Sequence, residues 1–213
     1  MDTIEITPAK IQQWAEETRR AAAVFGNEWD VKAVEWDGVL TVDSVVVECG
    51  SFKGRWALQI AERYNPRLYC FEPQTWAWRT SKKVLEGYSA EVWQFGLGHA
   101  RQHLPLHNHG TDGCGFSLLS KAHPDKPLPL GQINEIGEVF EVLGIEKVDL
   151  MLINIEGGEY TLIPHMFKQD IFPQRLMVQF HEGDCEGLRS LIEQHYTNLW
   201  DYGRTLTAWE RKP

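Results

Sequence analysis

From residue 44 onward, short apolar runs alternate with segments of helical periodicity, and this alternation limits the fold more than any other feature. The first run, Val45-Val46-Val47, is β-branched throughout, as expected for a strand buried on both faces of a parallel sheet. Alternating strands and helices are typical of an α/β domain. The predicted strands cover residues 44–48, 68–71, 91–95, 148–153 and 176–180, the predicted helices cover residues 54–64, 75–85, 134–143, 159–167 and 187–196, and a hairpin is predicted within residues 199–211.

Two segments stand outside this alternation. Residues 1–43 are predicted to form an N-terminal extension, with a helix that begins at Thr7-Pro8 and a hairpin around Asp37-Gly38. Residues 99–132 have no helical periodicity, and we predict a long loop with a short hairpin there. A long loop inside a compact domain is usually functional. We therefore predict one domain over residues 44–213, with the extension packed on it.

Composition narrows the partners and the compartment. The formal net charge is −9 without a run of Lys and Arg, which disfavours nucleic acid and anionic membranes as partners. The chain has no apolar stretch long enough for a transmembrane helix and begins with polar residues, so we expect neither a membrane span nor a signal peptide. Its four cysteines form no CxxC pair, which favours a reducing, cytoplasmic location.

A glycine-rich turn follows the first predicted strand. Its G-x-x-x-G spacing, from Gly50 to Gly54, differs from both the dinucleotide fingerprint and the P-loop, so a nicotinamide-dependent reductase is the less favoured enzyme class. The second strand ends at Glu72, where an acidic side chain can bind both hydroxyls of a ribose. Ligands of open α/β sheets bind at the carboxyl ends of strands. The turn and Glu72 together predict a site for a cofactor that carries a nucleoside.

Five segments between residues 44 and 181 resemble, in order, motifs of the FkbM-type methyltransferases. They are Val45 to Gly54 (the family's V-D-V-G-A-N-x-G), Phe71-Glu72-Pro73 (F-E-P), Phe95-Gly96-Leu97-Gly98 (A-L-G), Leu152 to Glu159 (K-I-D-V-E-G-x-E) and Val178-Gln179-Phe180-His181 (E-x-H). The resemblance implies the Rossmann-like class I methyltransferase fold, a mostly parallel seven-stranded sheet with helices on both faces and an antiparallel last strand. It also implies S-adenosylmethionine as cofactor and O-methylation of a hydroxyl on a sugar, a glycan or a small natural product.

The resemblance also implies which residues form the site. The first motif would contact the methionine part of the cofactor, Glu72 would hold the ribose, and the third motif would flank the adenine. The residues implied for cofactor binding are Glu48, Gly50, Ser51, Gly54, Glu72, Pro73, Gly96 and Leu97. Asn154 and Glu156, at the end of the fourth strand, would face the methyl group.

The chain departs from the family pattern at three positions, which hold Leu152, Asn154 and Gln179. Amides at the last two replace carboxylates that a hard divalent cation would need, so we expect no metal site. The departures also leave the catalytic base open, and a cofactor-binding module without catalysis remains an alternative.

His181 is a candidate base, because an imidazole titrates near neutrality, but it is equally a candidate for a hydrogen-bonded structural histidine. Glu156 is a candidate to orient the acceptor or take its proton, against the alternative that it caps the next helix. We expect Glu159 merely to complement a helix dipole. The 99–132 segment is rich in His, Asn and Asp, so it is expected to offer many polar and few apolar contacts, which favours a hydroxyl-rich acceptor over a flat hydrophobe. Its histidines could share a metal ion, but we expect this segment to bind the acceptor instead.

Overall fold

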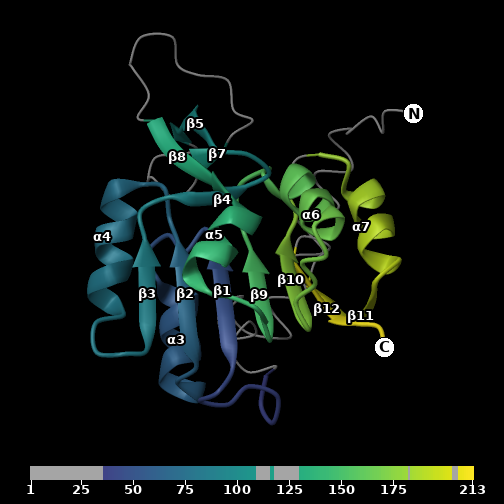
Figure 1. Cartoon of the computed structure of the whole chain (residues 1–213), viewed down its shortest axis with the longest axis horizontal. Coiled ribbons are helices and arrows are strands. Elements are labelled where there is room, and N and C mark those ends of the chain that lie inside the picture. The colour runs from purple at the N-terminus through teal and green to yellow at the C-terminus, as the bar shows by residue number, and fades with distance from the viewer. Residues whose placement is uncertain (1–35, 109–115, 118–129, 182, 203–205) are drawn as a thin grey trace.

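The computed structural model describes residues 36–108, 116–117, 130–181, 183–202 and 206–213, and Figure 1 shows a sheet flanked by helices. The predicted helix that begins at Thr7-Pro8 lies outside these residues. Residues 36–43 form turns instead of the second strand of the predicted hairpin. Trp36 and Leu40 from these turns are buried in the hydrophobic core, so this part of the extension packs on the domain.

A seven-stranded sheet forms the centre of the domain, in the order β11-β12-β10-β9-β1-β2-β3. Strands β10, β9, β1, β2 and β3 pair in parallel, whereas β12 is antiparallel to both β10 and β11. This arrangement confirms the predicted fold class, including the antiparallel last strand. The strands are β1 (Val45–Cys49), β2 (Arg67–Phe71), β3 (Ala90–Trp93), β9 (Leu150–Ile153), β10 (Arg175–Gln179), β11 (Tyr196–Tyr202) and β12 (Leu206–Arg211).

The strand order reverses beside β1. The chain runs outward from β1 through β2 to β3 and then returns to place β9 on the other side of β1. At such a reversal the two connections leave the sheet in opposite directions, which opens a crevice at the carboxyl ends of the strands. The topology therefore places a ligand site next to the ends of β1 and β9.

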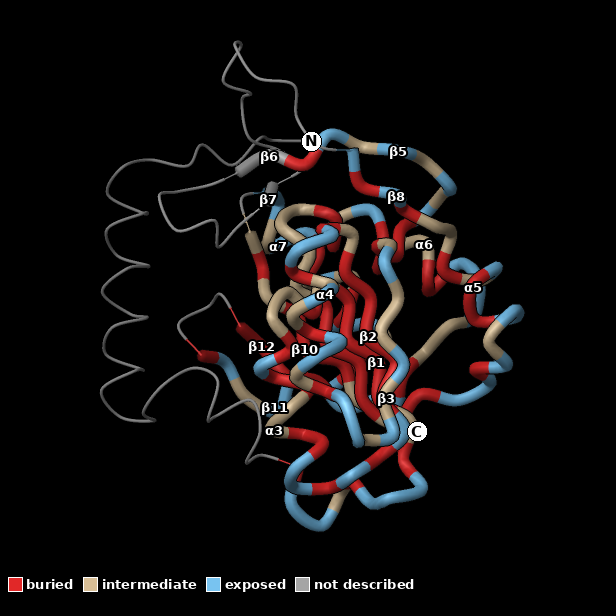
Figure 2. The backbone as a smooth tube through the Cα atoms, turned by 90° about the vertical axis from the view of Figure 1, so that its left-hand side faces the viewer, coloured by how far each residue is buried: buried red, intermediate tan, exposed pale blue. Residues whose placement is uncertain are grey.

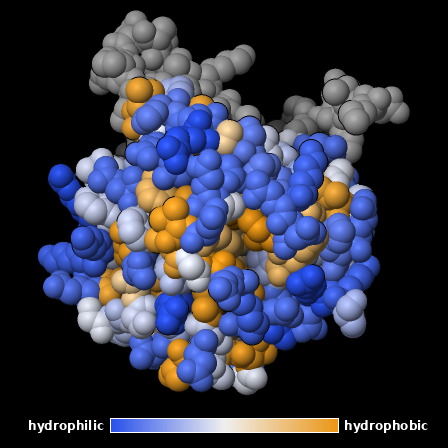
Figure 3. Space-filling view, in the orientation of Figure 1, coloured by the Kyte–Doolittle hydropathy of each residue, from blue (hydrophilic) through white to orange (hydrophobic). Residues whose placement is uncertain are grey.

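Helices cover both faces because side chains on a strand point alternately to opposite faces. Val47 and Cys49 share one apolar cluster with α5 (Ile136–Leu143), α6 (Glu159–Lys168) and α7 (Cys185–Glu193). Val46 belongs to the cluster on the other face, with Trp56 and Ile60 of α3 (Arg55–Tyr64), and α4 (Thr75–Val84) contacts α3 and β3. Figure 2 shows burial concentrated in the central strands, and Figure 3 shows a mostly hydrophilic face with apolar side chains near its centre.

A second, smaller sheet includes residues 102–105 and 130–132 of the 99–132 segment, for which a long loop with a short hairpin was predicted. It has the order β4-β8-β5, with β4 parallel and β5 antiparallel to β8, and a two-stranded pair of β6 and β7 adjoins it in sequence. These strands are β4 (Gly96–Gly98), β5 (Gln102–Pro105), β6 (His107–Asn108), β7 (Phe116–Ser117) and β8 (Leu130–Glu135). The antiparallel pair of β6 and β7 agrees with the short hairpin predicted in this segment. The loop prediction was wrong for β5 and for residues 130–132 of β8, because they pair across about thirty residues and no local periodicity reveals such pairing.

Two helices begin where side chains cap them. Glu135 accepts hydrogen bonds from the backbone N–H groups of Gly137 and Glu138, so α5 begins after it and not at Asn134 as predicted. Asp184 accepts from the N–H of Gly187 and starts α7 two residues before the predicted position. A side-chain oxygen at this position satisfies N–H groups that otherwise lack a partner inside the helix.

Candidate functional site

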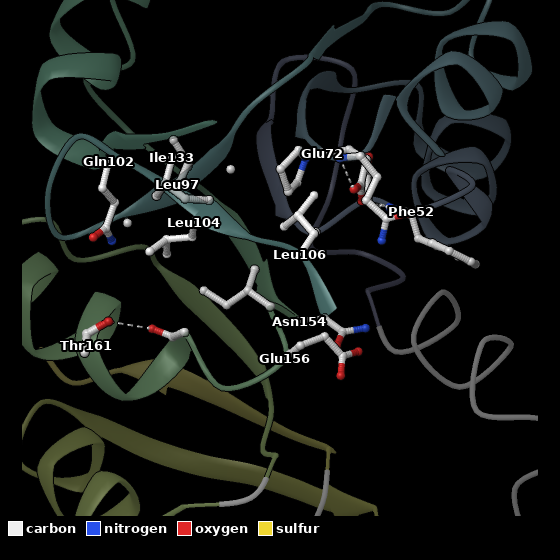
Figure 4. A pocket seen from close by; sticks show the side chains of 18 of the residues that line it. Phe52, Glu72, Leu97, Gln102, Leu104, Leu106, Ile133, Asn154, Glu156 and Thr161 are labelled. Carbon is white, nitrogen blue, oxygen red and sulfur yellow. Dashed lines mark hydrogen bonds between the residues drawn. The ribbon is translucent and has the colours of Figure 1, made fainter. Parts of the chain in front are cut away.

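A cavity of about 360 Å³ lies at the carboxyl ends of β1, β2 and β9. Figure 4 shows Glu72 and Phe52 on one side of it, Leu97, Gln102, Leu104 and Ile133 on the opposite side, and Asn154 and Glu156 together on a third. The elements that form its wall are the turn after β1, the end of β2, the β4-β8-β5 sheet, and the segment from the end of β9 into α6.

Gly50 begins the turn that lines the cavity. Its φ of +83° is in the left-handed region, and a Cβ at this position would lie 2.0 Å from the carbonyl oxygen of Asn154. The N–H groups of Gly50 and Ser51 both donate to the carbonyl of Phe71, at 2.9 and 3.2 Å. The absence of a side chain at Gly50 thus lets the turn after β1 close against the ends of both β2 and β9.

Gly54 has a different role from Gly50. It precedes α3 with a φ of +73°, and a Cβ there would lie 2.7 Å from the hydroxyl of Ser81 in α4. The hydroxyls of Ser51 and Ser81 lie 3.3 Å apart beneath the turn. Gly54 is not among the residues that line the cavity, whereas Gly50 and Ser51 are. In this structure Gly54 therefore allows α3 and α4 to approach each other.

Glu72 follows the end of β2 and lines the cavity, although only 4% of its surface is exposed. One carboxylate oxygen accepts from the N–H of Phe52 at 2.7 Å, and the other accepts from the N–H of Gln74 at 2.8 Å. Burial raises the pKa of Glu72 to about 7, while the two N–H donors act in the opposite direction. A carboxyl group at this edge can therefore change its charge near neutral pH.

Glu48 is not among the residues that line the cavity. It is 2% exposed and pairs in register with Cys70 and Leu152, which belong to the apolar cluster on the α3 face. The structure places Glu48 beneath the turn and beside Cys70. Contact between Glu48 and a cofactor stays a prediction from the sequence.

Pro73, Gly96 and Leu97 do line the cavity, and they form an apolar part of its wall. Gly96 packs tightly on the small sheet, because a Cβ there would lie 2.8 Å from the Cδ1 of Ile133. The side-chain Oε1 of Gln74 is buried in this wall without a hydrogen-bond partner among the described residues. The apolar wall can pack against a flat ring, and the Oε1 of Gln74 can accept a hydrogen bond from an amino group on the edge of such a ring.

The wall contributed by the small sheet combines apolar and polar side chains. Leu104, Leu106 and Ile133 line the cavity together with His99 and Gln102. Within the described part of the 99–132 segment, the lining residues are therefore two polar ones, His99 and Gln102, and two apolar ones, Leu104 and Leu106. The preference for polar contacts in this segment stays a prediction. The side chain of His107, together with His109 and His123, lies outside the described part of the chain.

Asn154 and Glu156 follow β9 and line the cavity together. The Oδ1 of Asn154 is buried and has no hydrogen-bond partner in the described structure. Glu156 has a φ of +53° and Gly157 a φ of +101°, so the backbone turns sharply after the strand. A left-handed conformation is unfavourable for glutamate, so the surrounding contacts must hold it.

His181 lies behind Glu156 and is not among the residues that line the cavity. Its Nε2 is 3.5 Å from a carboxylate oxygen of Glu156, and its Nδ1 is 3.0 Å from one of Glu159. Burial alone would lower the pKa of His181, but the two carboxylates outweigh it and raise the pKa to about 9. The structure therefore brings His181 to Glu156 rather than to the cavity itself.

Glu159 makes contacts that the sequence did not predict. Its side chain is fully buried and accepts hydrogen bonds from the N–H groups of Gly157 and His181, each at 2.9 Å. Glu159 lies in the first turn of α6, as expected, and in addition contacts the ring and backbone of His181. The available signal was the second glutamate of the E-G-x-E segment, which follows a strand end at fixed spacing.

Two further expectations concern metals and membranes. Within the described ranges, no group of three or more His, Cys, Asp and Glu side chains is placed to hold a metal ion. Independence from metal stays a prediction. None of the helices in the described part of the chain is both long and apolar enough to cross a membrane. Cys49, Cys70 and Cys185 are free thiols, and Cys114 lies outside the described residues.

The sequence matches no protein-family model and no curated protein. Solved structures do match: the O-methyltransferase TomG of Streptomyces achromogenes, involved in tomaymycin synthesis and solved with S-adenosylmethionine, is 11% identical, with a TM-score of 0.51 over 99% of this chain and 92% of its own. A Streptococcus mutans protein solved with S-adenosylhomocysteine is also 11% identical, with a TM-score of 0.51 over 88% of this chain and 99% of its own. The chain has the fold of the class I methyltransferases. In this methyltransferase fold, the cavity occupies the crevice beside β1.

Proposed function

We propose that this chain is an S-adenosylmethionine-dependent methyltransferase that methylates a hydroxyl of a sugar, a glycan or a small natural product. The observation that carries the proposal is the buried carboxylate of Glu72, which lines a cavity at the strand-order reversal of a class I methyltransferase fold. An acid at the end of the second strand is suited to bind the two hydroxyls of a ribose. Each oxygen of Glu72 accepts one backbone N–H and keeps a further lone pair for a ligand.

The residues of the cavity fit this cofactor. Gly50 and Ser51 would approach its methionine part, and Pro73, Gly96 and Leu97 would flank the adenine. The Oε1 of Gln74 and the Oδ1 of Asn154 are buried acceptors without partners among the described side chains, and the cofactor carries amino and hydroxyl donors. When bound, it supplies a methyl group that is already activated by a sulfonium.

The remaining task of the protein is to align the acceptor and remove its proton. Glu156 lines the cavity and is the proposed proton acceptor, with Asn154 beside it to orient the acceptor hydroxyl through its amide. His181 contacts Glu156 from behind, so its role is less direct than that of a residue on the cavity wall.

The apolar side chains of the small sheet, and of Leu106 directly after β5, favour the small-natural-product class within this proposal. Leu104, Leu106 and Ile133 offer contacts to a hydrocarbon or aromatic part of an acceptor, while Gln102 offers a polar contact. TomG, which shares the fold, takes part in the synthesis of such a product. The net charge of −9 disfavours nucleic acid as the acceptor. The free thiols agree with the reducing, cytoplasmic location that we propose.

Two measurements test the proposal. In calorimetry, the chain should bind S-adenosylmethionine and S-adenosylhomocysteine and should not bind NAD. A labelled methyl group should then be transferred to an acceptor in a mixed extract of metabolites and glycans. The labelled product should stay in solution when the proteins of the assay are precipitated. Binding without transfer would favour the cofactor-binding module, and binding of NAD alone would favour the reductase.

A further inference from the structure

Both ring nitrogens of His181 face carboxylates that come from two different segments. Glu156 belongs to the turn after β9, whereas Glu159 is the first residue of α6. The Nε2 of His181 lies 3.5 Å from Glu156, and the Nδ1 lies 3.0 Å from Glu159. His181 itself follows β10, so the three side chains join the ends of two neighbouring parallel strands to the start of a helix.

The backbone of His181 is held as firmly as its ring. Its N–H donates to the same oxygen of Glu159 that its Nδ1 contacts, at 2.9 Å. Its carbonyl accepts from the hydroxyl of Tyr160 at 2.7 Å and from the thiol of Cys185 at 3.5 Å. These contacts come from both α6 and α7 and fix the backbone of His181, while Glu156 and Glu159 contact its ring.

The charges of this cluster require a proton on the ring. A neutral imidazole has one N–H, so one of its two nitrogens would point a lone pair at a carboxylate. The imidazolium donates from both nitrogens and offsets one of the two negative charges. Glu159 is fully buried and accepts two backbone N–H groups, and a cation on the ring of His181 stabilises this buried charge further.

We propose that His181 is a positioning residue, protonated at neutral pH, that holds the carboxylate of Glu156 toward the cavity, and that Glu159 keeps it protonated and in place. The inference deepens the proposed function and rests on it for the role of Glu156. It differs from general-base catalysis by His181, because an imidazolium that donates from both nitrogens has no lone pair to accept a proton. The strained φ of +53° at Glu156 is then maintained by His181 on the side chain and by Glu159 on the N–H of Gly157.

The two roles of His181 predict opposite pH dependences. The groups that face its ring and backbone are Glu156, Glu159, Tyr160 and Cys185. A positioning cation is lost when the ring is deprotonated, so turnover should fall as the pH rises through about 9, where His181 titrates. A general base must be neutral, so turnover would instead rise over the same range.

The experiment combines NMR titration of the histidine rings in the full chain with pH profiles of methyl transfer. In the free protein, the ring of His181 should remain protonated well above neutrality. Glu156→Gln and Glu159→Gln should each shift its titration to lower pH. Titration of His181 near its ordinary pKa in the folded wild-type chain would overturn the proposal.

The second readout is kinetic. His181→Gln should lower kcat about 10²-fold, as for a misplaced catalytic group, and change the affinity for S-adenosylhomocysteine by less than about threefold. It should also remove the alkaline fall in turnover. His195→Gln is the matched control, because His195 is likewise half-buried but packs on Phe167 and Phe172. This variant should leave kcat and the alkaline fall in turnover unchanged.

Failure of this proposal can be told apart from failure of the proposed function. If Glu159→Gln does not fold, the NMR arm rests on Glu156→Gln, which removes a single contact of His181 at the cavity. A wild-type turnover that rises through pH 9 would overturn the positioning role and leave the methyltransferase in place. A protein that binds no S-adenosylhomocysteine would refute the proposed function, while the NMR titration would still decide the charge of His181.

Discussion

The carboxylate of Glu72 accepts a hydrogen bond from the backbone N–H of Phe52 at 2.7 Å. This bond joins the end of β2 to the turn after β1, and both residues line the same cavity. Phe52 has a φ of +47°, which is unusual for a residue with a side chain and leaves its N–H pointing at Glu72. The side chain proposed to bind the cofactor ribose thus also shapes the turn that would bind its methionine part.

Replacement of Glu72 by Ala is expected to weaken the binding of S-adenosylhomocysteine by roughly 1.5–3 kcal/mol, the range for a hydrogen bond to a charged group. Isothermal titration calorimetry measures the change. Glu91→Ala is a suitable control, because Glu91 is an exposed acid on β3 and its loss removes the same charge. Equal affinities for the wild-type chain and Glu72→Ala would exclude Glu72 from the site.

The affinity for S-adenosylhomocysteine is expected to rise with pH through neutrality. Burial raises the pKa of Glu72 to about 7, and the ionised carboxylate is the better acceptor for the ribose hydroxyls. Below that pKa, the affinity should fall by up to about tenfold per pH unit, as required when binding needs deprotonation. Calorimetry from about pH 5.5 to about pH 8.5, on both sides of the pKa, measures the affinity. An affinity that does not change with pH would contradict the prediction. The dependence should be absent in Glu72→Gln.

The stability of the free protein should show the opposite dependence on pH. The pKa of Glu72 is raised from 4.5 in the reference state to about 7 in the folded state, so the folded state binds the proton more tightly than the unfolded state. This contribution to the free energy of unfolding is fully present below pH 4.5 and is lost as the pH rises through about 7. Urea unfolding across this range, compared with Glu72→Gln, isolates the contribution. It should be missing from the variant.

Gly50→Ala is expected to destabilise the fold by more than about 2 kcal/mol, because strain at a left-handed position adds to a steric clash. The new Cβ would lie 2.0 Å from the carbonyl oxygen of Asn154, and this backbone atom cannot move independently of β9. Gly87→Ala is the matched control, since Gly87 has a φ of +93° with nothing within 4 Å of the added Cβ. Thermal unfolding should give a clearly larger loss at Gly50 than at Gly87, and equal losses would remove the clash as a cause.

Methyl transfer is expected to survive chelation of divalent cations. Asn154 and Gln179 stand where the FkbM-type pattern has carboxylates, and amides are weaker ligands for a hard cation. Assays with and without EDTA measure this directly. If EDTA abolishes turnover and magnesium restores it, then Glu156 or the histidines of the 99–132 segment hold a cation.

Much of the candidate site followed from strand ends that could be located in the sequence. Glu72 and Asn154 directly follow a buried apolar run, Glu156 lies two residues beyond Asn154, and parallel strands present their carboxyl ends at one edge. Gly50 could be located in the same way. Glu48 lies within such a run, one residue before the end of β1. Because side chains alternate along a strand, Glu48 points to the face of the sheet that α3 covers.

Residues 44–93 and 148–180 determine their part of the fold by themselves, because their strands are short, mostly apolar runs and their helices have a local period that can be measured in the sequence. The tertiary structure alone decided two other features. The β4-β8-β5 sheet arises from pairing between residues about thirty positions apart, such as Leu104 with Gly131, and the apolar wall that it adds to the cavity depends on that pairing. The charge and orientation of His181 depend on Glu156 and Glu159, which approach it only when β9 and β10 lie side by side. Periodicity is a property of neighbours along the chain, whereas burial and electrostatics are set by neighbours in space.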